Sequence, residues 1–238
     1  IVMSSTYRQD NRATEEQLSK DPRNRYLSRG PRFRLSAEVV RDQALAISGL
    51  LSGKQYGPPV YPPNPVKSVR NAFAGETVWT TSEGEDRYRR AIYTYLKRSS
   101  PHPLFETFDM ASRTVCNMRR IRTNTPLQSF MTLNDETFIE AARALAKLMR
   151  DVDGDVEVQL REGVRRALLH PASEDQISTL ASLYHDTKSA YESDFAAAAE
   201  LTGRSSIASS EEREETLELA SLTVVANISM RDQPSASR

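Results

Sequence analysis

The stretch TPLQSFMTLNDETFIEAARALAKLMR, residues 125–150, decides the fold of this chain. Thr125 is placed to cap a helix whose first position is Pro126, because proline lacks the N–H group that a helix start leaves unpaired. The Asn134-Asp135 pair ends this helix, since both side chains bond the backbone locally. Asp135 then caps a second helix. Apolar residues recur along that helix at intervals of three or four and form one face: Phe138, Ala142, Leu145 and Met149.

Capping motifs predict further helices toward the C-terminus. Ser-x-x-Gln at residues 173–176 opens a long helix that extends to about Thr202 and ends at Gly203, and Ser-x-x-Glu at residues 209–212 opens the last one. Residues 155–170 carry another apolar stripe before the first motif. The stripes that we expect to face inward are Val156, Leu160, Val164 and Leu168; Ile177, Leu180, Tyr184, Tyr191 and Phe195; and Leu217, Ala220, Val224 and Ile228.

Two helices are predicted near the N-terminus. Ser36 caps the clearer one, which has apolar residues at helical spacing and ends at Gly53. A shorter helix is predicted over residues 21–30, because Asp-Pro is a typical helix start and Gly-Pro a typical stop.

The segment between these helices and the central stretch is irregular. Five prolines between Pro58 and Pro65 exclude a helix and favour an extended path, with Tyr56 and Tyr61 as expected anchors. The β-branched and aromatic content of RYRRAIYTYLKRSS, residues 87–100, favours a strand. We therefore predict a mainly α fold: an irregular helical domain with a proline-rich loop excursion at residues 53–86 and room for a short β-hairpin near residues 75–97. Residues 1–150 would form the core of this domain, and residues 151–238 a helical segment packed on it.

Charge is unevenly distributed, although the net charge is zero. Residues 1–86 carry 12 basic and 10 acidic side chains, residues 87–150 carry 12 and 5, and residues 151–238 carry 8 and 17. A basic middle and an acidic end can complement each other within one molecule or between two. Nucleic-acid binding usually requires a net positive domain with aromatic residues among the exposed basic ones, so we expect no nucleic-acid partner.

The sequence also limits the membrane and redox chemistry that is expected. No apolar run approaches the roughly 20 residues that span a bilayer, so we expect no membrane span. The chain opens at IVMSSTYRQ without an initiator methionine or signal peptide, and we expect Ile1 to lie inside a longer protein. Cys116 is the only cysteine, which excludes an internal disulfide.

Basic and acidic side chains gather between residues 98 and 125. Guanidinium groups bind carboxylate, sulfate or phosphate through paired N–H groups, and free amides at a helix start can add to such an anion pocket. The alternative is a structural joint, in which the arginines bind loop carbonyls and the carboxylates of Glu106 and Asp109. We favour the joint because both carboxylates lie in the same block. The residues of the block are Arg98, Glu106, Asp109, Arg119, Arg120, Arg122 and Thr125, and the tight helix-to-helix joint follows at Asn134 and Asp135.

Cys116 is the one candidate nucleophile in this block. Arg113, Arg119 and Arg120 would lower the pKa of its thiol, and His102 is the nearest histidine that could orient it. Because cysteine is usually buried, we favour a buried structural thiol, and we expect His102 to be a packed loop residue. A zinc site needs about four ligands, so one cysteine with scattered histidines predicts no metal. The sequence contains no phosphate-binding loop, nucleophile elbow or His-Glu-x-x-His motif.

Several blocks of the sequence together resemble one family. They are DPRNRYLSRGPRFRLSAEVVRDQALAISGLLS, RRAIYTYLKRSSPHPLFETFDM, CNMRRIRTNTPLQSFMTLNDETFIEAARALA and, more faintly, ELASLTVVANISM. The chain is similar here to the planctomycete-specific domain of unknown function found at the C-terminal end of cytochrome-c-like secreted proteins. The resemblance implies an exported parent protein with haem c on an upstream domain and an extracytoplasmic location in the periplasm or at the cell surface. The chain departs from the expected pattern at its end, RDQPSASR, and it has no Cys-x-x-Cys-His for haem attachment.

These observations favour a non-catalytic role. The distinctive residues are of types that form joints, and no complete catalytic set is visible. We expect a helical accessory or scaffold domain that binds upstream domains of the same parent, another protein or a polysaccharide. The alternative is a component of an extracytoplasmic enzyme, or a glycan- or anion-binding site, built around the Arg, Glu, Asp and Cys residues of 98–122. Trp79, the only tryptophan, could stack on a sugar or serve as an anchor.

Overall fold

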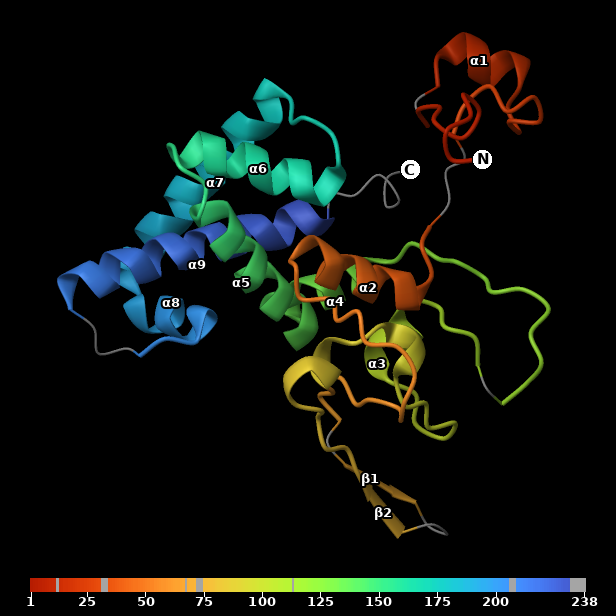
Figure 1. Cartoon of the computed structure of the whole chain (residues 1–238), viewed down its shortest axis with the longest axis horizontal. Coiled ribbons are helices and arrows are strands. Elements are labelled where there is room, and N and C mark those ends of the chain that lie inside the picture. The colour runs from red at the N-terminus through yellow and green to blue at the C-terminus, as the bar shows by residue number, and fades with distance from the viewer. Residues whose placement is uncertain are drawn as a thin grey trace. The chain divides into compact units, whose positions relative to one another are not determined.

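The structure is a computed structural model, and it describes residues 1–11, 13–30, 34–66, 68–71, 75–112, 114–205 and 209–231. The chain forms two compact units, Ile1–Leu35 and Ser36–Arg238. Helices account for most of the regular structure, as Figure 1 shows, so the prediction of a mainly α fold is confirmed.

Among the described residues of the smaller unit, the short helix α1 (Glu15–Lys20) is capped reciprocally by Thr14 and Gln17. The helix predicted over residues 21–30 is wrong. Asp21 lies at the end of α1, and its carboxylate accepts hydrogen bonds from the N–H groups of Arg25 and Tyr26, each at 2.8 Å. These bonds hold the backbone in turns instead of a helix.

In the larger unit, α2 (Ala37–Ile47) begins after Ser36 as predicted but ends earlier than expected. Gly49 has φ +74°, a left-handed conformation that glycine adopts without strain, and the N–H groups of Leu50 and Leu51 both bond Leu45 O. Gly53 is therefore not the stop.

The central stretch folds as the sequence predicts. Helix α3 (Pro103–Thr107) precedes it, α4 (Pro126–Asn134) follows Thr125, and α5 (Glu136–Arg150) follows Asp135. The next helix, α6 (Val156–Leu168), starts at Asp155, whose side chain accepts a hydrogen bond from Val158 N at 3.0 Å. The predicted face of α5 is buried: Phe138, Ala142, Leu145 and Met149.

The long helix predicted over residues 174–202 is two helices, α7 (Glu174–Ser193) and α8 (Phe195–Thr202). Asp194 breaks it, because its backbone leaves the helical region and its side chain caps α8 by accepting from Ala197 N at 3.2 Å. Gly203 ends α8 at φ +69°, as predicted.

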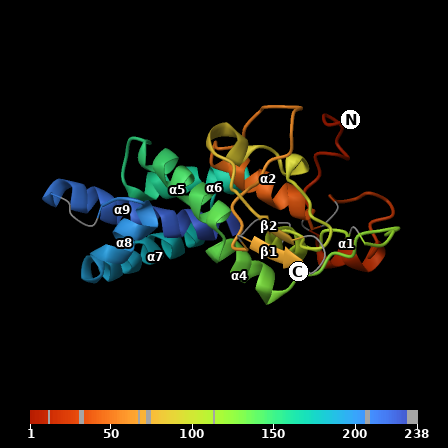
Figure 2. The same cartoon turned by 90° about the horizontal axis from the view of Figure 1, so that it is seen from below.

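The last helix, α9 (Ser210–Arg231), runs through the middle of the helical body, with α5 and α6 on one side and α7 and α8 on the other (Figure 2). Leu217 and Ala220 are buried as predicted, but Val224 and Ile228 are only half-buried. The prediction of one inward-facing apolar stripe on this helix was incomplete, because α9 packs against several helices and is buried on more than one face. The other buried apolar residues of α9 are Leu219, Leu222, Val225, Ala226 and Met230.

One hydrophobic core joins α2, α3, α5, α6, α7 and α9, so residues from both sides of residue 150 share it. A smaller cluster lies where α8 meets α9, with Tyr191 and Phe195 packed against it. No described helix combines the length and apolar character needed to cross a membrane.

The proline-rich segment is extended, as predicted, and it lies beside residues 93–95. Val60 N donates to Tyr93 O, and Tyr95 N donates to Val60 O, both at 2.8 Å. The strand predicted over residues 87–100 is wrong, because this segment contains short 3₁₀ turns, η1 (Gly84–Tyr88) and η2 (Ala91–Tyr93). Of the two expected anchors, Tyr61 packs between other rings, whereas Tyr56 is 80% exposed.

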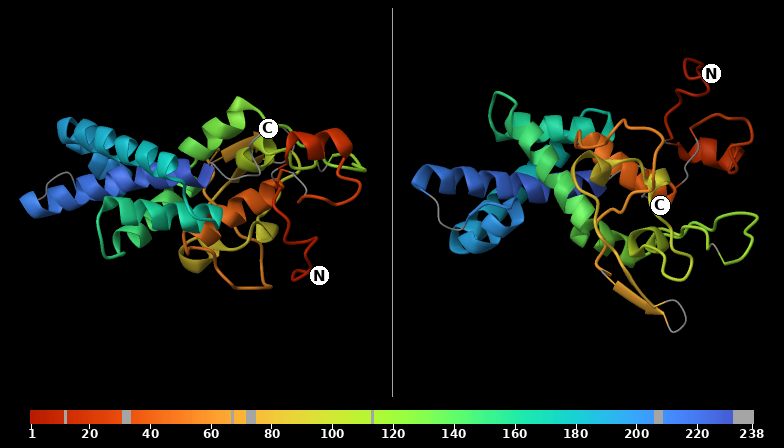
Figure 3. Two further views of the ribbon diagram at one scale, coloured as in Figure 1. Left: turned by 90° about the horizontal axis from the view of Figure 1, so that it is seen from above. Right: turned by 60° about the horizontal axis from the view of Figure 1, so that its bottom comes forward.

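The chain does form one antiparallel hairpin, β1 (Ser68–Asn71) with β2 (Gly75–Val78), in which Ser68 pairs with Val78. It lies earlier in the chain than the expected position near residues 75–97. Figures 1 and 3 show it extending away from the helical body of the larger unit.

Candidate interaction surface and binding pocket

An ion pair fastens the predicted block around residues 98–122. The guanidinium of Arg120 donates to both carboxylate oxygens of Glu38 in α2, at 2.7 and 2.9 Å. Partial burial alone would raise the pKa of Glu38, but the hydrogen bonds from Arg120 hold this pKa below its usual value. The loop is thus fastened to α2, and the predicted pairing of Arg120 with Glu106 or Asp109 is wrong.

Asp109 forms a different joint. Its carboxylate accepts from Thr123 N at 2.7 Å and from the Nε2 amide of Gln128 at 3.2 Å. Gln128, which is buried in α4, also donates to Thr107 O at 2.9 Å and accepts from Thr125 N at 3.1 Å. These bonds connect the end of α3 with the start of α4. The Asp109 backbone has φ +60°, a left-handed conformation that few residues other than glycine adopt.

The Asn134-Asp135 pair connects α4 and α5. Asp135 is buried, and its side chain accepts from Thr137 N at 2.9 Å, while the exposed Asn134 donates to Phe130 O at 2.8 Å. Burial raises the pKa of Asp135. Both side chains therefore act on the backbone of the two helices that they connect.

The remaining members of the block do not gather into an anion pocket in the described part of the chain. Arg98, Glu106 and Arg119 are exposed, and none of them forms a hydrogen bond or an ion pair through its side chain with the described residues. Arg122 is exposed too. Arg113 lies outside the described residues.

Cys116 is exposed, so the expectation of a buried thiol is wrong. His102 is buried, as expected: its Nε2–H donates to Pro63 O at 2.8 Å, and its Nδ1 accepts from Leu104 N at 3.3 Å. Burial lowers the pKa of His102 to about 4, which keeps the ring neutral. A histidine with both nitrogens occupied in the interior cannot orient an exposed thiol.

The sequence reasoning missed the buried arginines that hold the irregular segment. Arg41 of α2 has no exposed surface and donates to Arg89 O at 2.8 Å and Arg87 O at 2.9 Å. Arg89, also fully buried, donates to the carbonyls of Tyr56 and Pro58. A signal was present for Arg41, because helical spacing places it on the same face as Ala37, Ala44 and Leu45.

The loop before α4 and the outer face of α4 expose large apolar side chains, which we call the 115–130 surface. Each of its five residues exposes at least 62% of its area, although side chains of this kind are favoured inside. Figure 1 shows this loop reaching well away from the helices. Arg119 adds a positive charge among them. The five residues are Val115, Met118, Ile121, Leu127 and Phe130.

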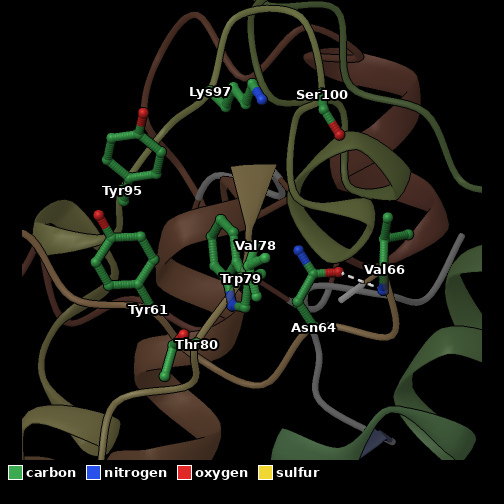
Figure 4. A pocket seen from close by; sticks show the side chains of 9 residues that line it. All are labelled: Tyr61, Asn64, Val66, Val78, Trp79, Thr80, Tyr95, Lys97 and Ser100. Carbon is green, nitrogen blue, oxygen red and sulfur yellow. Dashed lines mark hydrogen bonds between the residues drawn. The ribbon is translucent and has the colours of Figure 1, made fainter. Parts of the chain in front are cut away.

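A pocket of about 260 Å³ lies at the base of the hairpin, beside the proline-rich segment. Three aromatic rings form one side of it (Figure 4): the Tyr61 centroid lies 5.1 Å from those of Trp79 and Tyr95. Trp79 is fixed by its indole N–H, which donates to Pro62 O at 2.8 Å, and by the His102 ring at 5.6 Å. Val66 and Val78 add apolar surface.

Polar groups occupy the rest of this aromatic pocket. Asn64 lies at its floor, with Oδ1 accepting from Val66 N at 2.8 Å, and Ser100 and Lys97 lie together at the opposite side in Figure 4. The Lys97 ammonium nitrogen is shielded from solvent and has no hydrogen-bond partner among the described residues. Its three N–H donors are therefore unused among the described residues. In the described part of the chain, no three His, Cys, Asp or Glu side chains come together as a metal site would require.

These features define a mainly helical domain with an exposed apolar surface and a small aromatic pocket. The model of the protein family of unknown function DUF1553, named PSD1, matches residues 1–184, and the chain belongs to this family. No curated protein and no solved structure matches the chain.

Proposed function

We propose that this chain is a non-catalytic helical accessory domain that binds a neighbouring domain or partner protein through the 115–130 surface. The observation that carries the proposal is the exposure of five large apolar side chains within sixteen consecutive residues, 115–130. Exposed apolar groups that gather in this way are typical of interaction sites. The arginines and acids that form contacts, such as Arg120 with Glu38, hold the 115–130 segment in place. These contacts contribute no reactive group.

We further propose that the parent is an exported, cytochrome-c-linked protein of a planctomycete, located in the periplasm or at the cell surface. Support comes from the sequence blocks that resemble the planctomycete-specific domain. Haem c would be attached to an upstream domain, because attachment requires two cysteines and a histidine in one motif and this chain has only Cys116.

The chemistry of the surface suggests the kind of partner. Met118, Ile121 and Phe130 require an apolar groove, and the exposed Arg119 beside them favours acidic groups at the rim of that groove. We therefore infer a partner surface with an apolar floor and an acidic edge, contributed by an upstream domain of the parent.

Cys116 provides the test, because it is the only cysteine of the chain and lies within the surface. The rate at which a maleimide labels Cys116 should be measured in the isolated chain and in the full-length parent, with the labelled peptide quantified by mass spectrometry. Docking predicts labelling at least tenfold slower in the parent. A benzophenone maleimide at Cys116 should then cross-link to an acidic-rimmed segment of an upstream domain.

Two variants make the test specific. Met118→Asp with Ile121→Asp should restore fast labelling in the parent, whereas Leu169→Asp, an equally exposed apolar position at the end of α6, should leave labelling slow. Equal labelling rates in the chain and the parent would overturn the proposal. Slow labelling that appears in the isolated chain only at high protein concentration would indicate a second copy of this chain as the partner, which also contradicts it.

A further inference from the structure

We propose that the aromatic pocket at the base of the hairpin binds one anionic sugar residue of a polysaccharide, a pyranose that carries a carboxylate or a sulfate. The site is separate from the 115–130 surface and does not depend on the function proposed for it. The argument rests on the shape of the aromatic wall, the unpartnered ammonium of Lys97 and the size of the cavity.

The aromatic wall fits the apolar face of a sugar ring. A pyranose has C–H groups on its faces and hydroxyl groups around its edge, so it is matched by rings that are apolar on the face and polar at the tip. Tyr61 and Tyr95 lie with their ring planes 31° apart, and Trp79 packs edge-on against Tyr61 at 78°. The polar side chains of Asn64 and Ser100 line the same pocket (Figure 4).

Lys97 indicates a negative charge on the ligand. Lys97 lines the pocket, and its ammonium nitrogen is covered and has no acceptor among the described residues. A buried donor without a partner is costly, and a charged one more so, which makes this group a strong binding point for a carboxylate or sulfate oxygen. Every other lining side chain is neutral, so the pocket contains no acidic group to pair with a cationic ligand and Lys97 would repel it.

The size of the pocket restricts the ligand to a single ring. Pockets that enclose a drug-sized molecule measure about 300–1,000 Å³, and the volume here is about 260 Å³. The pocket also opens to solvent, since Val78 at its edge is exposed. One sugar residue can therefore enter while the rest of a polysaccharide continues outside.

Trp79 reports on occupancy directly, because it is the only tryptophan of the chain. Its fluorescence, and its indole N–H signal in NMR spectra, should be followed while the whole chain is titrated with four probes: trigalacturonate, galactose 4-sulfate, neutral galactotriose and sodium sulfate. We expect both signals to change on titration with an anionic sugar. The affinity for this sugar should be at least tenfold higher than the affinity for galactotriose or sodium sulfate. The two anionic probes show whether a carboxylate or a sulfate is preferred.

Lys97→Met keeps most of the side chain but removes the charge, and it should weaken anionic sugar binding at least tenfold, as expected for loss of a charge-assisted hydrogen bond. Lys147→Met is the matched control: it removes the same charge from an exposed position on α5 and should change affinity less than twofold. If Lys97→Met does not fold, the wild-type titrations decide. Equal affinity for galactotriose, tight binding of sulfate alone, or no response of Trp79 at millimolar sugar would each refute the site.

Discussion

Arg41 shows how single residues hold the irregular half of the larger unit. Its guanidinium is fully buried, and burial lowers its pKa to about 10, so it is still charged at neutral pH. The backbone between residues 84 and 94 has few regular hydrogen bonds of its own, and its carbonyls need donors. Arg41 supplies them to residues 87 and 89, and Arg89 supplies them to the proline-rich segment.

We predict that Arg41→Met destabilises the protein by roughly 2–5 kcal/mol, because one buried and one partly buried carbonyl lose their donor while the apolar stem is retained. The free energy of unfolding from urea titration checks this. Arg90→Met is the control: Arg90 is mostly exposed, and its closest approach to Asp42 is 3.5 Å, so its loss should change stability by less than about 1 kcal/mol. Equal effects of the two variants would show that the buried bonds contribute nothing specific.

His102 predicts a dependence of stability on pH. The pKa of the His102 ring is 6.5 in the unfolded chain and about 4 in the folded chain, where burial disfavours the charged form. The unfolded state therefore holds more protons in this window, and stability should fall by up to roughly 3 kcal/mol as the pH drops from about 6.5 to about 4. Unfolding at pH 7.5, 6 and 5 should be compared with His102→Gln, which has no ring to protonate. A wild-type minus variant difference that does not change with pH would contradict this origin.

At the scale of elements, the helices with explicit caps were predictable and the irregular segment was not. The caps at Thr125-Pro126, Asp135 and the Ser173 box place helix starts correctly, because a cap is a local interaction between neighbouring residues. Asp194 was missed because its neighbours continue the helical apolar pattern, and the break depends on the side chain capping α8. Residues 87–100 were wrongly predicted to form a strand, because their aromatic side chains pack on the proline-rich segment and not within a sheet.

The contact between α5 and α6 yields a prediction at this scale. A Cβ atom on Gly163 would lie 2.7 Å from the Sδ and Cε atoms of Met149, whose side chain is fully buried. Gly163→Ala should therefore destabilise by about 1 kcal/mol, since overpacking exceeds the gain in helix propensity. In a Met149→Ala background the same change should be neutral or stabilising, which a double-mutant cycle from urea unfolding measures. Stabilisation by Gly163→Ala alone would mean that the Met149 side chain can move aside at little cost.

At the scale of the whole molecule, α9 organises the larger unit. The family match covers residues 1–184, yet the core of this chain includes Leu219, Leu222 and Val225 from α9. These side chains fill the space between α5, α6 and α7, which are distant in sequence from α9. The match and the folding unit therefore have different boundaries.

We predict that a chain ending at residue 208 loses cooperative unfolding and binds the dye ANS, because the apolar faces of α5, α6 and α7 lose their common partner. Removing residues 1–35, a compact unit by themselves, should leave the cooperative transition of the larger unit in place. Near-UV circular dichroism and thermal scans distinguish the two deletions. A sharp transition in the chain without α9 would show that α9 is an addition to the core rather than part of it.

The sequence alone determined the helical class, most helix starts and the extended proline-rich path, because capping, periodicity and the missing proline N–H act between near neighbours. Tertiary structure decided which charges are buried: Arg41 and Arg89 inside, Arg98 and Arg119 outside. It also decided that Tyr61, Trp79, Tyr95 and Lys97 line one pocket and that Cys116 is exposed. Apart from Arg41, whose helical spacing already placed it on the buried face of α2, these outcomes depend on which distant segments share a space, and no local pattern of residues encodes that.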